Sequence, residues 1–305
     1  MRSPLPTLPK PLCAATGIVL DQLFGEPDAS LHPVVHFGRI MEHVERGGYR
    51  DAKGPGVLHA LAGTFLGVGS GALLRSTAVA TGLSVGGRSL RRAANDVEVA
   101  LIDGDLQKAR ALLPSLVGRD PSELVEAEIA RAVVESVAEN TVDAVVAPAL
   151  WAAVAGARGA LGYRAINTMD AMVGHHSTRY EHYGWASARL DDLVNWLPAR
   201  VTAALVVLVR PRAANQVFRA VTTQAKEHPS PNAGVSEAAF AAALGITLGG
   251  RNIYGERVED RPLLGRGRRA ETGDIEAANR LSRDVTVALV VILGLVGIRL
   301  WGKKR

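Results

Sequence analysis

Cysteine and aromatic residues are scarce in this 305-residue chain, and each shortage excludes a class of structure. Cys13 is the single cysteine, so the chain can form no internal disulfide and no zinc site built on Cys-x-x-Cys pairs. Aromatic residues make up only 5% of the chain, whereas hydrophobic residues make up 48%. Small apolar residues in such excess favour close helix packing over a bulky aqueous core and indicate a membrane protein.

Two common nucleotide and metal motifs are also absent. The chain has neither a Gly-x-x-x-x-Gly-Lys-Ser/Thr phosphate loop nor a His-Glu-x-x-His zinc helix. If the protein uses ATP, the nucleotide must bind at a site without a standard motif. The net charge is only +5, and cationic residues gather in loops beside apolar runs, notably over 251–269. Juxtamembrane loops explain this pattern, and no nucleic-acid partner is expected.

Long apolar runs predict a mainly α, polytopic integral membrane protein with polar loop and helix regions between its spans. The clearest run ends near Arg299, which can reach the lipid interface beside the basic C-terminus. We predict a single membrane domain over 1–305, with candidate spans at 57–85, 142–161, 193–209 and 285–301. The third run contains Asn195, Pro198 and Arg200, which leaves open a re-entrant or partly buried element in place of a simple span.

Glycines recur every fourth residue inside the first predicted span. Gly63, Gly67 and Gly71 form the small-xxx-small pattern that lets two helix backbones approach closely in lipid. Their neighbours favour helix and contain no turn partners, so loop glycines are a weaker interpretation. We therefore predict a close helix contact along this face.

A stripe of ionisable residues runs through an otherwise apolar segment before the second predicted span. Its members recur at spacings of three and four and share one helical face: Glu128, Arg131, Glu135, Glu139 and Asp143. The first three could form a purely structural ladder of ion pairs. No basic residue follows within reach of Glu139 or Asp143 along the helix. Because unpaired carboxylates are costly in apolar surroundings, we predict a functional acidic face there.

A second polar region mixes carboxylates with arginines at short spacing: Asn167, Asp170, Arg179, Arg189, Asp191 and Asp192. Carboxylates hold hydrated Mg²⁺ and arginines fork phosphate oxygens, so the mixture suits a nucleotide-phosphate site. A solvated, salt-bridged loop is the alternative. His175, His176 and His182 lie in the same region, but a metal site there is disfavoured because no carboxylate pairs with them at helical spacing.

A third polar cluster contains His228, Ser230 and Asn232, and Pro229 and Pro231 fix its backbone as an extended segment. Ser236 is predicted to cap the helix that follows.

Taken in order, these segments resemble the adenosylcobinamide-phosphate synthases of cobalamin biosynthesis, the CobD/CbiB family. The resemblance rests on motifs such as Glu139-Asn140-Thr141-Val142-Asp143 and Arg189-Leu190-Asp191-Asp192, and it extends over 20–27, 32–39, 139–148, 163–174, 179–200, 228–234 and 274–278. His175-His176 and Val235 depart from the residues usual in the family. Neither departure touches the carboxylate or arginine positions.

The resemblance implies a multi-pass enzyme of the cytoplasmic membrane, an acid–amine ligase that forms a carbon–nitrogen bond. It would join adenosylcobyric acid to aminopropanol phosphate, or to a related amino-alcohol phosphate, and give adenosylcobinamide phosphate. ATP would be the co-substrate and Mg²⁺ the metal, with membrane lipid and other corrinoid-pathway membrane enzymes as partners. A non-enzymatic sensor, or an ancillary signalling or permease protein of related fold, is the alternative.

We assign roles to the matching residues on this basis. Glu139, Asp143 and Asp170 are the predicted catalytic carboxylates, and Glu139, Asp143, Asp191 and Asp192 are the predicted Mg²⁺ ligands. The residues predicted to bind substrate or phosphate are Asn167, Arg179, Arg189, His228, Ser230 and Asn232.

Overall fold

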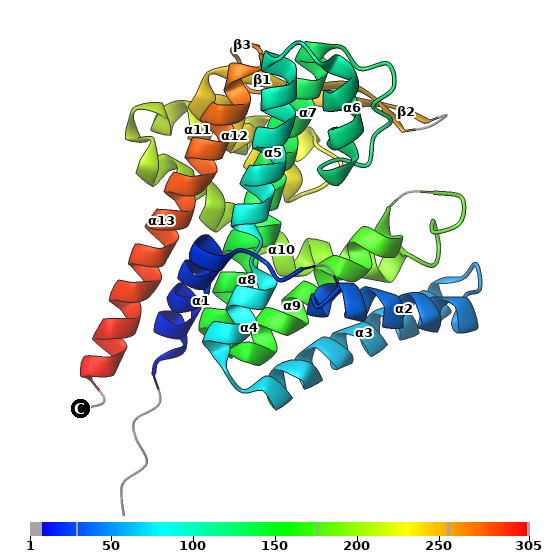
Figure 1. Cartoon of the computed structure of the whole chain (residues 1–305), viewed down its shortest axis with the longest axis vertical. Coiled ribbons are helices and arrows are strands. Elements are labelled where there is room, and N and C mark those ends of the chain that lie inside the picture. Colours follow the sequence, from blue (N-terminus) through cyan, green and yellow to red (C-terminus); the bar gives the residue numbers. More distant parts are fainter. Residues whose placement is uncertain (1–7, 29, 176, 255–256, 304–305) are drawn as a thin grey trace, which may run out of the picture. The chain divides into compact units, whose positions relative to one another are not determined.

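The computed structural model describes residues 8–28, 30–175, 177–254 and 257–303 (Figure 1). The chain folds into two compact units. Unit 1 comprises Met1–Gly86, Ala147–Val194 and Leu289–Arg305, and unit 2 comprises Gly87–Val146 and Asn195–Ala288. Whether 1–305 behaves as the single predicted domain stays a prediction, and each unit is described by itself.

Four helical segments are long and apolar enough to cross a membrane: α3 (Lys53–Leu74), Glu126–Ala155, α10 (Trp185–Val209) and α13 (Gly273–Gly302). At 1.5 Å per residue, helices of this length exceed the roughly 30 Å thickness of a bilayer core. The protein is therefore a mainly α, polytopic membrane protein, as the sequence predicts. The second segment is built from α7 (Glu126–Thr141), the π-helix η2 (Val142–Val146) and α8 (Ala147–Ala155).

The predicted span limits differ from these bounds for local reasons. The run over 57–85 is two helices, because α3 ends at Leu74 and Ser76 caps α4 (Thr77–Ser84) by accepting a hydrogen bond from Val79 N. The run over 142–161 is interrupted at Gly156, whose φ of 70° is not that of an α-helix. The helix α9 (Ala157–Met169) begins at the next residue. Pro198 lies inside a continuous α10, so the proline does not break the helix there.

Unit 1 is held together by the contact between α3 and α9, which run side by side (Figure 1). It also contains α1 (Lys10–Phe24), α2 (Pro33–Gly48), α4, α8 and the π-helix η3 (Asp170–Gly174), together with the start of α10 and the end of α13. Gly63, Gly67 and Gly71 face α9. A Cβ atom at Gly67 would lie 2.5 Å from Ala165 Cβ and 2.7 Å from the Leu161 carbonyl oxygen. The predicted small-residue contact is confirmed.

Gly67→Ala is expected to destabilise the protein although alanine is the better helix former. The added methyl must push the two backbones apart, and overpacking of this kind costs about 1–3 kcal/mol. The matched control is Gly69→Ala, because a Cβ there meets nothing within 4 Å. This control should be neutral or gain about 0.5–1 kcal/mol from helix propensity. Thermal unfolding in detergent measures both, and equal melting temperatures would contradict the contact.

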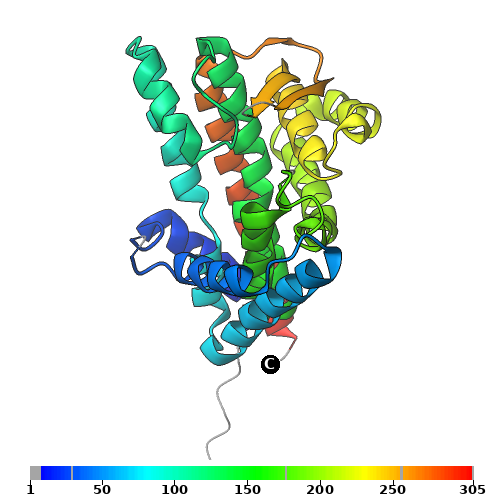
Figure 2. The same ribbon diagram turned by 90° about the vertical axis from the view of Figure 1, so that its right-hand side faces the viewer.

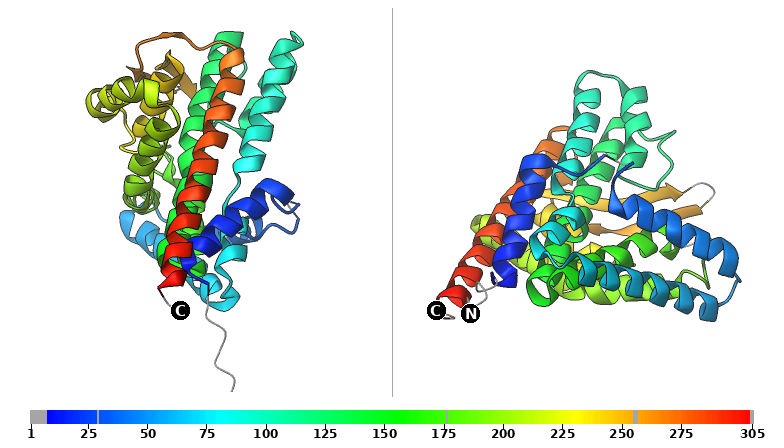
Figure 3. Two further views of the ribbon diagram at one scale, coloured as in Figure 1. Left: turned by 90° about the vertical axis from the view of Figure 1, so that its left-hand side faces the viewer. Right: turned by 60° about the horizontal axis from the view of Figure 1, so that its bottom comes forward.

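Unit 2 packs helices around α7, which is buried along nearly its whole length. It contains α5 (Gly87–Ile102), α6 (Leu106–Leu112), η1 (Leu113–Ser115), η4 (Pro211–Ala213), α11 (Ala214–Thr223), η5 (Ala225–Glu227) and α12 (Ala233–Leu244). The start of α13 lies beside α7 (Figure 3, left), where Thr141 Oγ1 donates a hydrogen bond to Ser282 Oγ at 2.8 Å. Long-range contacts therefore fix α7 on several sides.

A three-stranded sheet packs on α12 (Figure 2), in a region where sequence patterns indicated only loops. The strands are β1 (Ile246–Tyr254), β2 (Arg257–Leu264) and β3 (Arg268–Arg269), in the order β2-β1-β3. β1 is antiparallel to β2 and parallel to β3, and its register shifts between Leu248 and Gly250. Ile246, Leu248 and Leu264 are fully buried, so the sheet closes one side of the unit 2 core.

Candidate active site

Glu135 belongs to an ion-pair network that ties α7 to β1. Its carboxylate binds Arg119, lies 3.5 Å from Arg131 Nη1 and accepts a 2.9 Å hydrogen bond from Gly249 N. Arg131 in turn donates to the carbonyl oxygens of Gly249 and Arg251. Glu135 and Arg119 are both buried. Every charge in this network has a partner, and the network holds α7 against β1.

The predicted ladder of ion pairs is therefore present only in part. Arg131 pairs with Glu135, but Glu128 turns back to the start of α7, where its Oε2 accepts from Val125 N at 3.1 Å. A carboxylate at this position satisfies a free backbone N–H and complements the helix dipole. It thereby helps to start α7 at Glu126.

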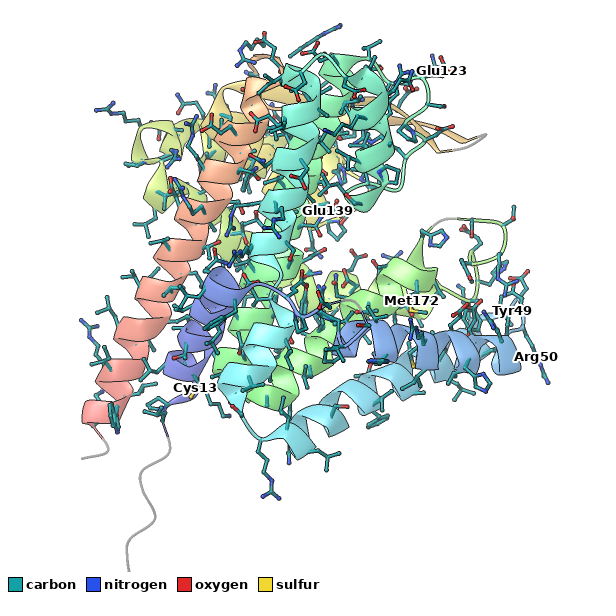
Figure 4. All side chains as sticks on the ribbon, in the orientation of Figure 1. Cys13, Tyr49, Arg50, Glu123, Glu139 and Met172 are labelled. Carbon is teal, nitrogen blue, oxygen red and sulfur yellow. The ribbon has the colours of Figure 1, made fainter. Side chains whose placement is uncertain are left out.

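Glu139 lies one turn beyond Glu135 and is half-buried on α7 (Figure 4). No basic residue follows it along the helix, as predicted, but Arg119 and Arg261 lie within electrostatic range. These cations come from the segment before α7 and from β2. The fold thus places near Glu139, from other elements, the cations that are missing from α7 after this residue.

Asp143 lies outside the α-helix that the charge pattern predicted. It is half-buried in η2, where the five residues Val142–Val146 are π-helical. A π-turn shifts the helical register. The stripe of ionisable residues therefore keeps its regular spacing only within α7, which ends at Thr141. Such turns occur frequently at functional sites.

Glu237 on α12 is a site residue that the sequence patterns missed. Its side chain is 1% exposed, and neither carboxylate oxygen accepts a hydrogen bond from the described residues. His228 Nε2 is 3.8 Å and Arg261 Nη1 4.0 Å from Oε1. Burial raises the pKa of Glu237 well above its ordinary value, and the nearby charges of Glu135 and Glu139 raise it further.

The raised pKa of Glu237 predicts a pH-dependent effect of Glu237→Gln. When a carboxyl stays protonated in the folded protein but ionises in the unfolded chain, the free energy of unfolding falls as the pH rises above the ordinary pKa of 4.5. Glutamine does not titrate. The variant should match the wild type near pH 4.5 and become progressively more stable than the wild type toward pH 7. Melting temperatures across this range test the sign, and a constant difference would contradict the raised pKa.

His228 directs its ring toward Glu237 because the following loop holds the other nitrogen. Ser230 N donates to His228 Nδ1 at 3.1 Å, which leaves Nε2 on the Glu237 side. Ser230 Oγ accepts from Asn232 N at 3.3 Å and from Ala233 N at 3.2 Å, so it satisfies the start of α12. The predicted cap at Ser236 is wrong, since this residue lies inside α12.

Asn232 is also engaged within the protein, because its Oδ1 accepts a 2.8 Å hydrogen bond from Arg200 Nη1 on α10. Of the three polar residues predicted in this segment, His228 approaches the buried carboxylate of Glu237. We call the group in unit 2 the acid cluster, and it comprises Glu139, Glu237, His228, Arg119 and Arg261.

The remaining predicted residues lie in unit 1, where α9 and α10 bring part of them together. Asn167 Nδ2 donates to Asp191 Oδ1 at 3.4 Å, and Arg189 Nη1 lies 3.7 Å from Asp192 Oδ2. Asp170 begins η3 directly after α9. Asn167, Asp170 and both aspartates of α10 are half-buried, and Arg189 is largely exposed.

Arg179 is anchored rather than free. Its Nη2 donates to Glu45 Oε1 at 2.9 Å, and its guanidinium lies 4.2 Å from the ring centroid of Tyr49. Tyr180 Oη donates to the same Glu45 oxygen at 2.9 Å. These contacts fasten the segment before α10 to the end of α2, a structural role that the sequence pattern did not reveal.

The described residues contain no group of three or more His, Cys, Asp or Glu side chains that could hold a metal ion. His182 instead pairs with Asp51 at 3.0 Å, and His175 packs against Tyr180. His176 lies outside the described residues. Mg²⁺ commonly uses only one or two carboxylates and takes its other ligands from phosphates and water. The oxygen donors of Glu139 and Asp143, or of Asp191 and Asp192, suit an ion carried by a phosphate substrate.

Comparisons with known proteins agree over nearly the whole chain. The family model described as CobD/Cbib protein matches residues 14–282. The Cobalamin biosynthesis protein CobD of Mycobacterium tuberculosis is 45% identical over 290 residues, which cover 90% of this chain and 92% of that protein. The protein of the same name in Rhodobacter capsulatus is 39% identical over 303 residues, or 93% and 96% of the two chains. No solved structure matches.

Proposed function

Because the chain belongs to the CobD/CbiB protein family, we propose that it acts in cobalamin biosynthesis as an ATP-dependent ligase. In this proposal it joins adenosylcobyric acid to aminopropanol phosphate, or to a related amino-alcohol phosphate, and releases adenosylcobinamide phosphate. The four long apolar helices support a position in a membrane, and we place the protein as a multi-pass protein in the cytoplasmic membrane. Other membrane enzymes of the corrinoid pathway are the expected partners.

The acid cluster is the observation that carries the proposal. Glu139 on α7 and Glu237 on α12 lie within electrostatic range of each other, in a largely buried setting that also contains His228 and two arginines. Amide formation from an ammonium group requires a proton acceptor, and activation of a carboxylate by ATP requires cations near the phosphate. The cluster offers both kinds of group within one unit.

The proposed reaction has two steps. The carboxylate of adenosylcobyric acid attacks the γ-phosphorus of ATP, which forms an acyl phosphate and releases ADP. The ammonium group of the second substrate loses one proton, and its nitrogen attacks the acyl carbon. Phosphate leaves with the electrons of the broken C–O bond and takes the second proton that the nitrogen gives up. Each amide formed therefore consumes one ATP and yields ADP and phosphate. Burial keeps water from hydrolysing the acyl phosphate.

We assign the proton acceptor to Glu139, with Asp143 as the second carboxylate on the same helical segment. Arg119 and Arg261 balance the negative charge that develops on the phosphate. His228 orients the substrate group that is bound beside Glu237. In unit 1, Arg189 is the more available phosphate ligand, because Arg179 is already bound to Glu45. Asn167, Asp170 and Asp191 are proposed to bind the phosphate-bearing substrate or its metal.

Mg²⁺ would be held by Glu139 and Asp143, or by Asp191 and Asp192. When bound, it would neutralise phosphate charge. The assignment to unit 1 is weaker at Asp192, since that carboxylate already faces Arg189 at 3.7 Å.

Loss of the protein in a cobalamin-producing cell tests the proposed place of the reaction. Corrinoid synthesis should stop after adenosylcobyric acid, and added cobinamide should restore cobalamin because it enters after the missing amide bond. Accumulation of an earlier intermediate, or failure of cobinamide to restore synthesis, would contradict the proposal. Normal cobalamin levels would favour the sensor or permease alternative.

A further inference from the structure

Unit 2 contains a cavity of about 580 Å³ whose lining shares no residue with the acid cluster, although α12 contributes to both. Its walls come from α11, α12 and the turn after β2, and the lining residues used below are Phe218, Arg219, Gln224, Gly265 and Arg266. Small-molecule sites commonly enclose about 300–1,000 Å³. The cavity is therefore large enough for a substrate of nucleotide size.

The charge of this cavity is positive and uncompensated. Among the residues that the structure describes, Arg219 and Arg266 line it and no aspartate or glutamate does. Among the described residues, neither guanidinium has an ion pair or a hydrogen-bond partner. Arginine is the side chain best suited to fork phosphate oxygens, and two unpaired guanidinium groups at one cavity favour a phosphate-bearing anion.

An aromatic ring lies beside these cations. Phe218 precedes Arg219 on α11 and is 71% exposed, whereas Val217 and Ala220 bury the opposite side of the helix. Gln224 Oε1 accepts a 2.8 Å hydrogen bond from Gly265 N, which holds the turn after β2 against α11. A flat base can stack on an exposed phenyl ring, and stacking of this kind contributes about 1–3 kcal/mol per base.

We propose that this cavity binds the nucleoside triphosphate of the reaction, with its phosphates on Arg219 and Arg266 and its base on Phe218. The identity of the nucleotide rests on the proposed function. The charge and the ring are features of the cavity itself. This site has no Gly-rich phosphate loop, in keeping with the sequence. A phosphate group could also come from an anionic lipid, because α11 begins five residues after α10 ends at Val209.

Binding of a trinitrophenyl-ATP probe, and its displacement by ATP, tests the site on the full chain in nanodiscs of zwitterionic lipid. The double variant Arg219→Ala, Arg266→Ala should bind at least about tenfold more weakly, since it loses two charge-assisted contacts. Phe218→Ala should weaken binding further. Arg212→Ala is the matched control, because it removes an exposed charge nearby that does not line the cavity. Melting temperatures should be unchanged in all variants.

Equal ATP affinity in the wild type and the double variant would overturn the inference. So would a double variant that keeps ATP but loses binding to phosphatidylglycerol vesicles, which would assign the cavity to lipid. The measurements distinguish a wrong cavity assignment from a wrong proposed reaction. If amide forms and the KM for ATP is unchanged in the double variant, only the cavity assignment is wrong. If ATP binds at the cavity but no amide forms, only the proposed reaction is wrong.

Discussion

Glu139→Gln is expected to lower amide formation per folded molecule by a factor of about 10² to 10⁴, the usual cost of losing a general base or metal ligand. Glutamine keeps the size and helix propensity of glutamate and removes only the negative charge that the chemistry uses. The half-buried Glu139 has no ion pair as close as that of Glu135, so its replacement should leave stability unchanged or slightly higher.

Asp143→Asn tests the second carboxylate of the same segment in the same assay. If Asp143 holds Mg²⁺ with Glu139, the variant should raise the Mg²⁺ concentration needed for half-maximal turnover. Near-normal turnover in both variants would defeat the catalytic assignment of this helix face. Turnover should be expressed per folded molecule, because a loss of folded protein would otherwise imitate a loss of chemistry.

Glu135→Gln should have the opposite effect, with a large loss of stability and a smaller loss of turnover per folded molecule. The substitution leaves Arg119 buried opposite a neutral side chain and weakens the tie between α7 and Gly249. Breaking a buried ion pair by removing one partner typically costs about 3–5 kcal/mol. Chemical or thermal unfolding in detergent measures this loss.

The double variant Glu135→Leu, Arg119→Met is the control for the ion pair. Replacing both charges by apolar side chains avoids a stranded Arg119 but still deprives Arg131 and Gly249 N of the Glu135 carboxylate, so it should recover part of the stability lost in Glu135→Gln. A Glu135→Gln protein as stable as the wild type would contradict the structural role. If the turnover of Glu135→Gln per folded molecule instead fell as far as that of Glu139→Gln, the assignment of a structural role to Glu135 and a catalytic role to Glu139 would be wrong.

The helical fold could be predicted from apolar runs, but the ends of the helices could not. Hydropathy averages over many residues, so it did not register Ser76 as a cap or Gly156 as a break between helices. The glycine pattern in α3 was more exact, because only residues without side chains fit where α3 meets α9. Strand β1 was missed because Gly249 and Gly250 resemble a loop in sequence.

The acidic stripe on α7 could be predicted because its members are close in sequence. The rest of the acid cluster could not, since Arg119, Glu237 and Arg261 come from elements that meet α7 only in the fold. One signal was available. Glu237 is the single ionisable residue of an Ala-rich apolar helix, and a charge in such a setting is a functional candidate by default.

Polar residues in a tight loop proved harder to interpret. Ser230 and Asn232 were predicted to bind substrate, yet the structure uses their oxygens to begin α12 and to hold Arg200. Short polar side chains between prolines serve both purposes, and sequence spacing does not separate them. Their role in binding stays a prediction.

Amide formation by the purified full chain in lipid is the most direct test of the account. The protein is given adenosylcobyric acid, aminopropanol phosphate and ATP with Mg²⁺, and corrinoid and nucleotide products are followed together. We predict adenosylcobinamide phosphate with one ADP per amide bond, and almost none from Glu139→Gln protein that is folded equally well. Absence of the amide from folded wild-type protein, or equal yields from both proteins, would contradict the central claim.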